Sequence, residues 1–276
     1  MQAKAFYAEN DLELARRGLE ANLKLLDVFQ HTNPNNPILK TMLAQAYGGY
    51  GYIFVETDMI SSNDKEKIKY HQSRAIDFYT RGKNFGLSVL MEENSSLRKA
   101  IQKNDFALLM SSAKSLGKSD LYTLFWTCFN WALLINIDKT NVDEIAQLPK
   151  LKILLNRLVE IDPTYFYSAS LALKATIEAA MPRMLGGKPR LAQEAYEQAL
   201  KASGRKMLLI QLLYGQYGAP ALQDKKLFKD LFAEIEKADL NIDPDIILIN
   251  SMAKIKAHAL EKSLENSFIE EDDSTR

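Results

Sequence analysis

The sequence predicts an all-α fold built from paired helices, and three observations support this prediction. Apolar residues recur with a helical period along almost the whole chain of 276 residues. Runs with the alternating pattern of a strand are nearly absent. Small, aromatic and proline residues between 151 and 204 are spaced as in stacked helical hairpins. An array of hairpins suits this length, because each pair of helices needs only its neighbours.

The first two predicted helices are separated by a proline-containing turn at 33–37. One helix spans 11–31 and the other runs to about Asp58. The second contains Gly48, Gly49 and Gly51, although each glycine costs a helix about 1 kcal/mol relative to alanine. We therefore expect another helix or a ligand to approach this helix closely.

The remaining helices follow from periodicity and from Asn, Asp and Ser at the N-cap positions. The helix at 119–137 is apolar nearly all round, so we expect it to be buried. We expect residues 1–266 to form a single domain and the acidic segment 267–276 to be a frayed tail. The predicted helices span 64–82, 84–92, 94–103, 105–114, 119–137, 147–161, 165–181, 189–202, 205–221, 224–238 and 244–266.

The repeat spacing is clearest near Ala192, Tyr196 and Ala199, which match the small, aromatic and alanine positions of a 34-residue tetratricopeptide-type unit. Pro163 matches the closing proline of the preceding unit. Ala192 then comes about seven residues too late, and the segment Met181–Gly187 accounts for the excess. This segment is predicted to be an inserted loop on one face of the array.

Composition excludes several classes of function. Lys and Arg number 35, as do Asp and Glu, so there is no global attraction to nucleic acid or to an anionic membrane. No apolar run approaches the roughly 20 residues of a spanning helix. The first residues lack the apolar segment of a signal peptide, which fits either a cytoplasmic protein or one whose leader has been removed.

No catalytic constellation is found. The three histidines are not at metal-ligand spacing, and Cys128 lies in an apolar run, so we expect a buried thiol, no metal and no cofactor. Glu56 and Asp58 could serve acid–base chemistry, but no partner histidine accompanies them. We therefore predict that the protein is not an enzyme.

Aromatic and arginine residues leave two interpretations open. Tyr47, Tyr50 and Phe54 lie near one another in the sequence, and Trp126 and Trp131 share the apolar helix. They either pack the core or line a groove for a ligand. Arg81, Arg183 and Arg190 are candidates to bind an anion or to form structural ion pairs.

Nine parts of the chain carry a combined signal: 47–50, 54–56, 74–87, 124–126 with Trp131, 161–165, 182–187, 192–200, 213–214 and 227–228. Together these segments resemble the periplasmic T component of tetratricopeptide-repeat-associated TRAP transporters. The resemblance covers about residues 40–240, and its most specific piece is the segment 182–187.

The resemblance implies degenerate tetratricopeptide-like helical hairpins, an α-solenoid, wrapped around a buried core helix. It also implies an exported periplasmic lipoprotein, attached to the membrane only through an N-terminal lipidated cysteine that this chain does not show. Such proteins are expected to bind the solute-receptor (P) component, to form homotrimers with a pore, and to handle a hydrophobic cargo, with a carboxylate-bearing molecule as one option.

The resulting hypothesis is a non-enzymatic transporter adaptor that passes or shelters a hydrophobic ligand. The predicted channel residues are Tyr47, Tyr50, Phe54, Trp126 and Trp131. The predicted loop or interface residues are Arg183, Met184, Leu185, Gly186 and Gly187. The alternatives are a generic tetratricopeptide scaffold for proteins or peptides, which would show a clamp of matched Lys and Arg residues, and a hydrolase on a helical scaffold.

Overall fold

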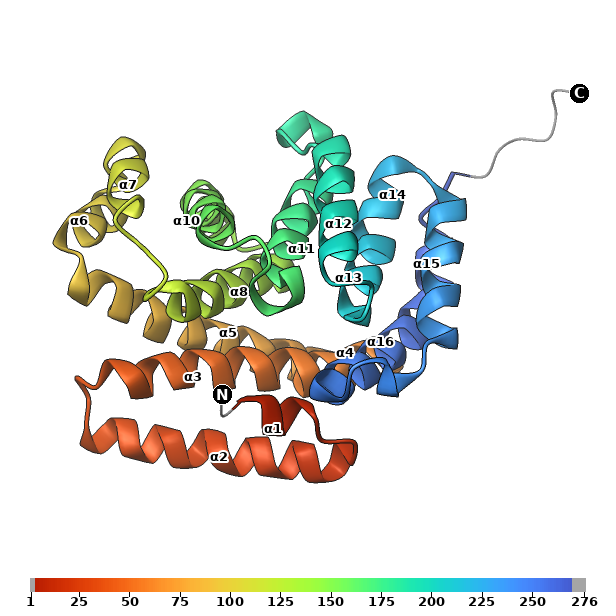
Figure 1. Ribbon diagram of the computed structural model, residues 1–276, viewed down its shortest axis with the longest axis horizontal. Helices are drawn as coiled ribbons and strands as arrows, with labels where there is room; N and C mark the ends of the chain where they lie inside the picture. The colour runs from red at the N-terminus through yellow and green to blue at the C-terminus, as the bar shows by residue number, and fades with distance from the viewer. Residues whose placement is uncertain (1–2, 270–276) are drawn as a thin grey trace, which may run out of the picture. The chain divides into compact units, whose positions relative to one another are not determined.

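The computed structural model describes residues 3–269, apart from the side chains of residues 3, 4 and 185 (Figure 1). Within this range the chain forms helices and turns and no strand, which confirms the all-α fold class. The chain divides into an N-terminal unit, Glu9–Tyr165, and a C-terminal unit, Met1–Ala8 with Phe166–Arg276. The single domain over 1–266 stays a prediction.

In the N-terminal unit, successive helices pack as layers. Helix α3 lies between α2 and α5, and α8 packs against α3, α5 and α10 (Figure 1). Asp11, Asn36 and Asp64 cap α2, α3 and α5 by accepting hydrogen bonds from backbone N–H groups of the first turn. The elements are α2 Leu12–Thr32, α3 Pro37–Tyr50, the π-helix η1 Gly51–Val55, α4 Glu56–Ile60, α5 Lys65–Glu93, α6 Ser95–Lys103, α7 Phe106–Ala113, α8 Leu121–Ile137, α9 Val142–Ile145 and α10 Leu148–Ile161.

Helix α8 is the buried helix that its apolar sequence predicts, since most of its side chains are buried. Glycines on its neighbours make this possible. A Cβ atom at Gly48 would lie 2.8 Å from Asn130 Oδ1, one at Gly82 would lie 2.2 Å from the same oxygen, and one at Gly86 would lie 2.2 Å from Thr127 Oγ1. We expected either a helix or a ligand to approach the glycines of the second helix, and the approach of α8 explains Gly48.

Helix α5 differs from its prediction, because it runs without a break from Lys65 to Glu93 where two helices, 64–82 and 84–92, were expected. The expected break after residue 82 is absent. The structure instead places Gly82 and Gly86 at the contact with α8, where tertiary packing offsets their low helix propensity.

The C-terminal unit is a series of antiparallel helices with α1 attached. The predicted helix at 205–221 begins later, at Leu208, and contains a π-helix. Residues Phe166, Tyr167 and Ser168 at the start of α11 all have positive φ angles, a left-handed geometry that is costly for residues other than glycine. The elements are α1 Ala3–Tyr7, α11 Tyr165–Ala180 (its first residue lying in the N-terminal unit), the 3₁₀ turn η2 Arg183–Leu185, α12 Pro189–Ala202, α13 Leu208–Leu213, the π-helix η3 Tyr214–Gly218, α14 Ala219–Leu222, α15 Lys225–Lys237, the 3₁₀ turns η4 Leu240–Ile242 and η5 Pro244–Ile246, and α16 Ile247–Glu265.

The repeat positions Ala192, Tyr196 and Ala199 are fully buried on α12. The Tyr196 ring stacks on Tyr214 with centroids 4.6 Å apart, and its hydroxyl donates to the Leu213 carbonyl at 3.1 Å. These contacts pair α12 with the helix formed by α13, η3 and α14.

The segment expected to fray is held at its start. Phe268 is buried, and its ring lies 5.4 Å from that of Phe228. Residues 270–276 of the predicted tail lie outside the described residues.

We predict opposite effects for two glycine substitutions in the N-terminal unit. Gly82→Ala should lower the free energy of unfolding by about 1–2 kcal/mol, because the new methyl group collides with Asn130 and this cost exceeds the gain in helix propensity. Gly49→Ala, which meets nothing within 4 Å, should raise it by about 0.5–1 kcal/mol. Urea unfolding followed by circular dichroism measures both, and equal effects would contradict the packing role of Gly82.

Candidate functional site

The predicted insertion forms a compact loop between α11 and α12. Pro182 follows the end of α11, and Gly186 turns the chain with a φ angle of 91°. The Gly187 N–H donates to the Pro182 carbonyl at 3.1 Å, and the Lys188 N–H donates to the Glu178 carbonyl at 3.1 Å. A Cβ atom at Gly187 would lie 1.8 Å from the Met181 carbonyl oxygen, so the loop requires glycine there.

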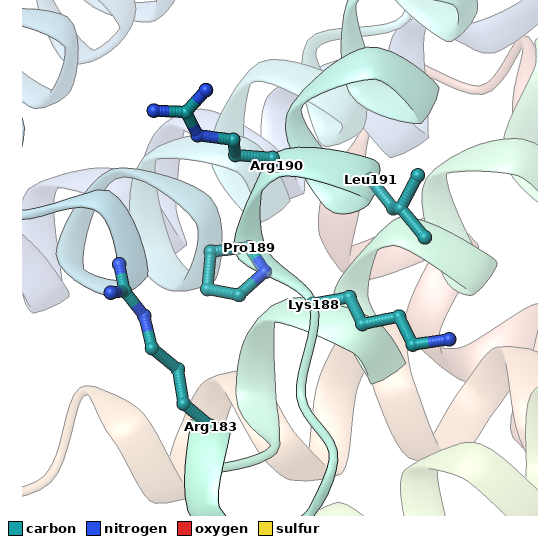
Figure 2. A pocket seen from close by; sticks show the side chains of 5 residues that line it. All are labelled: Arg183, Lys188, Pro189, Arg190 and Leu191. Atoms are coloured by element: carbon teal, nitrogen blue, oxygen red, sulfur yellow. The ribbon is translucent and has the colours of Figure 1, made fainter.

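An open hollow of about 240 Å³ adjoins this loop. Figure 2 shows that Arg183 and Arg190 extend to one side of Pro189, whereas Lys188 and Leu191 extend to the other. Pro189 occupies the first turn of α12, where its fixed φ angle suits the start of a helix. We refer to residues 181–191 as the basic loop.

The basic loop carries three cations that have no counter-ion in the described part of the chain. Arg183, Lys188 and Arg190 form neither an ion pair nor a side-chain hydrogen bond with any described residue. By contrast, Arg16 makes two hydrogen bonds of 2.7 Å to Asp58, and Arg205 pairs with Glu234. The N-terminus of α12 carries the positive end of the helix dipole, which adds to the field of the three cations. No side chain accepts a hydrogen bond from the first turn at the N-cap residue Lys188.

Apolar side chains accompany these charges. Met184 is 98% exposed and Leu191 is 50% exposed. A surface that combines arginine, methionine and leucine with unpaired positive charge is suited to bind a carboxylate or an acidic protein surface.

The structure places the predicted loop residues Arg183, Met184, Gly186 and Gly187 together on this surface. The backbone of Leu185 belongs to η2, but its side chain lies outside the described residues. Sequence reasoning did not include Lys188 and Leu191 in the site. The available signal was that Lys188 is the N-cap residue of α12 and Leu191 lies in its first turn, directly after the inserted segment.

The predicted channel residues Tyr47, Tyr50 and Phe54 form a row inside the N-terminal unit, and each is at most 3% exposed. Arginines cover the row. The Arg16 guanidinium lies 4.7 Å from the centre of the Phe54 ring, and that of Arg74 lies 5.6 Å from the Tyr50 ring. Burial raises the pKa of the Tyr50 hydroxyl. These contacts show that the row packs in the core.

Trp126 and Trp131 are also buried, on α8. The Trp126 ring packs against Phe129, with centroids 5.3 Å apart, and Phe129 contacts Tyr52 of η1 at 5.7 Å. The indole N–H of Trp131 is buried without a hydrogen-bond partner, and the Lys83 ammonium lies 5.7 Å from its ring. Core packing accounts for all five predicted aromatic residues, and a ligand channel along them stays a prediction.

Three observations concern other kinds of site. The described residues contain no group of three or more His, Cys, Asp or Glu side chains placed to hold a metal ion. Cys128 is fully buried, and burial raises the pKa of its thiol. No helix among residues 3–269 has both the length and the apolar character needed to span a bilayer.

Comparison with known proteins places the chain in a family. No curated protein matches its sequence. The model of a family described as TRAP transporter T-component matches residues 8–268, which is nearly the whole chain. This match confirms the resemblance inferred from the sequence, and the chain belongs to the TRAP transporter T-component family.

Proposed function

We propose that this T component is a non-enzymatic adaptor that docks the solute-receptor (P) component through the basic loop and helps to pass or shelter a hydrophobic ligand. Family membership supplies the coarse role, which is that of an accessory component of a TRAP-type transporter with a periplasmic location. The observation that carries the finer proposal is a group of three cations on the basic loop that have no counter-ion among residues 3–269 and that lie beside exposed apolar side chains.

The chemistry of the basic loop suits a partner with an acidic surface. Arginine and methionine are enriched at protein interfaces. Arg183 and Arg190 can each form two parallel hydrogen bonds to a carboxylate. Their charge also accelerates encounter with an oppositely charged surface, and salt weakens this effect. Met184 and Leu191 provide apolar area that becomes buried on docking.

The proposed ligand path lies within the N-terminal unit. Its supporting observation is the π-helix η1, which contains Tyr52 and Phe54 and interrupts the α-helical hydrogen-bond pattern, since single-turn π-helices are frequent at functional sites. Because these rings are buried, a ligand would have to displace them. The lipid anchor and the homotrimer also belong to this proposal, and the anchor would precede the described residues.

We predict that a photo-crosslinking amino acid at position 184 captures the solute receptor in the envelope fraction of the source cell. The same amino acid at Val142, which is 75% exposed in the N-terminal unit, should capture it at least fivefold less. Mass spectrometry of the crosslinked bands identifies the partner. Capture at 142 but not at 184, or capture of unrelated proteins alone, would contradict docking through the basic loop.

A charge reversal tests the role of the cations. Arg183→Glu with Arg190→Glu should weaken binding of the purified receptor at least tenfold, because attraction becomes repulsion. Lys201→Glu reverses an exposed charge at the other end of α12 and is the control, which we expect to change the affinity less than twofold. Equal effects of the two changes would show a general charge effect rather than a site.

We predict that a brominated fatty acid quenches the fluorescence of Trp126 and Trp131, which are the two tryptophans of the chain. Bromine quenches only on close contact, so quenching places the acyl chain beside α8. Trp126→Phe and Trp131→Phe assign the signal to one ring, and the unbrominated acid is the control. Absence of quenching at saturating fatty acid would contradict a ligand path along these residues.

A further inference from the structure

The last described residues of the chain lie beside Gln223 in the C-terminal unit. The Gln223 side chain donates to the Ser267 carbonyl at 3.4 Å and accepts from the Ile269 N–H at 3.0 Å. Between Ser267 and Ile269, Phe268 is buried against Phe228. The structure therefore holds residues 267–269 at the end of α14.

The end of α14 lies close to the basic loop. A short connection joins α12 to α13, so α12 and the helix over 208–222 are antiparallel, with Tyr196 against Leu213 and Tyr214. Pro189 is seven residues before Tyr196, which is roughly 10 Å along the helix axis at 1.5 Å per residue. Neighbouring helix axes lie about 8–10 Å apart. Figure 1 shows the start of α12 and α14 at the same end of this helix pair.

The sequence after Ile269 complements the charge of the basic loop. Residues 270–273 read Glu-Glu-Asp-Asp, which provides four carboxylates. An extended chain covers at most about 3.3–3.6 Å per residue, so four residues can span about 13–14 Å, which exceeds the spacing of neighbouring helix axes. Arg183, Arg190 and Lys188 have no counter-ion in the described part of the chain.

We propose that the acidic segment Glu270–Asp273 binds the basic loop of the same chain and thereby competes with the solute receptor. The competition rests on the proposed function, whereas the contact itself does not. Tethering gives the segment an effective concentration in the millimolar range at the loop. Exposed ion pairs are individually weak, so a tighter-binding acidic partner displaces the segment and salt weakens its binding.

Zero-length carbodiimide crosslinking of the full chain tests the contact, because it joins a lysine amine to a carboxylate that touches it. Lys188 reports on the basic loop. The control is Lys225, an exposed lysine two residues after Gln223 that is outside the loop. After correction for the reactivity of each amine, we expect crosslinks from 270–273 to Lys188 to exceed those to Lys225 at least fivefold, and to fall at 1 M salt.

Crosslinks to Lys225 alone, or to neither lysine, would overturn the proposal. Mixing ¹⁴N- and ¹⁵N-labelled chains shows whether each crosslink joins one chain or two. A majority of mixed-isotope crosslinks would overturn binding within the same chain.

A peptide measurement tests the competition without the receptor. The probe is a fluorescent peptide that carries the Glu-Glu-Asp-Asp sequence. The full chain with Glu270→Gln, Glu271→Gln, Asp272→Asn and Asp273→Asn should bind it at least fivefold more tightly than the unaltered chain does. Adding Arg183→Gln and Arg190→Gln should remove this binding, and equal binding by all three proteins would overturn the proposal. Photo-crosslinking of the solute receptor at position 184 is a separate measurement. Either proposal can therefore fail while the other stands.

Discussion

The contact between Asn130 and the glycines that face it is the constraint on which the N-terminal unit depends. The Asn130 side chain is fully buried and donates to the Ala44 carbonyl of α3 at 2.8 Å and to the Trp126 carbonyl of its own helix at 2.7 Å. Gly48 and Gly82 leave room for it. Because a buried N–H group left without an acceptor costs free energy, the bond from the Asn130 amide nitrogen to α3 favours one position of α8 against α3, although the Asn130 Oδ1 atom has no partner among the described residues. The aromatic rings pack around the helices that it brings together.

The C-terminal unit uses its aromatic and glycine residues in a different way. The stacked rings of Tyr196 and Tyr214 pair two helices, and the end of this pair displays the basic loop. Gly187 holds the loop against the Met181 carbonyl, so the backbone is compact while the charged side chains face solvent. The N-terminal unit thus contains the predicted channel residues as core, and the C-terminal unit carries the surface that suits docking.

Helix type and approximate position could be predicted from the sequence, because apolar periodicity and capping residues act locally. The buried character of α8 and the loop at 181–187 were predicted in the same way. The unbroken α5 was not, since the low helix propensity of Gly82 and Gly86 is offset by their contact with α8, and that contact is not visible in the local sequence. The two π-helices also escaped prediction, because a single residue inserted into a helical turn leaves the apolar pattern almost unchanged.

The sequence by itself determined the all-α class, the inserted loop and the residues that mark the family, because each depends on residue types at fixed spacing. Only the tertiary structure decided which of the marked residues are buried and which charged ones are paired. Tyr47, Tyr50 and Phe54 are buried, and arginines from other helices cover them. Arg183 and Arg190 were also candidates for structural ion pairs, yet neither forms an ion pair with a carboxylate of the described residues. Burial and charge pairing depend on residues far apart in the chain, and local spacing does not contain that information.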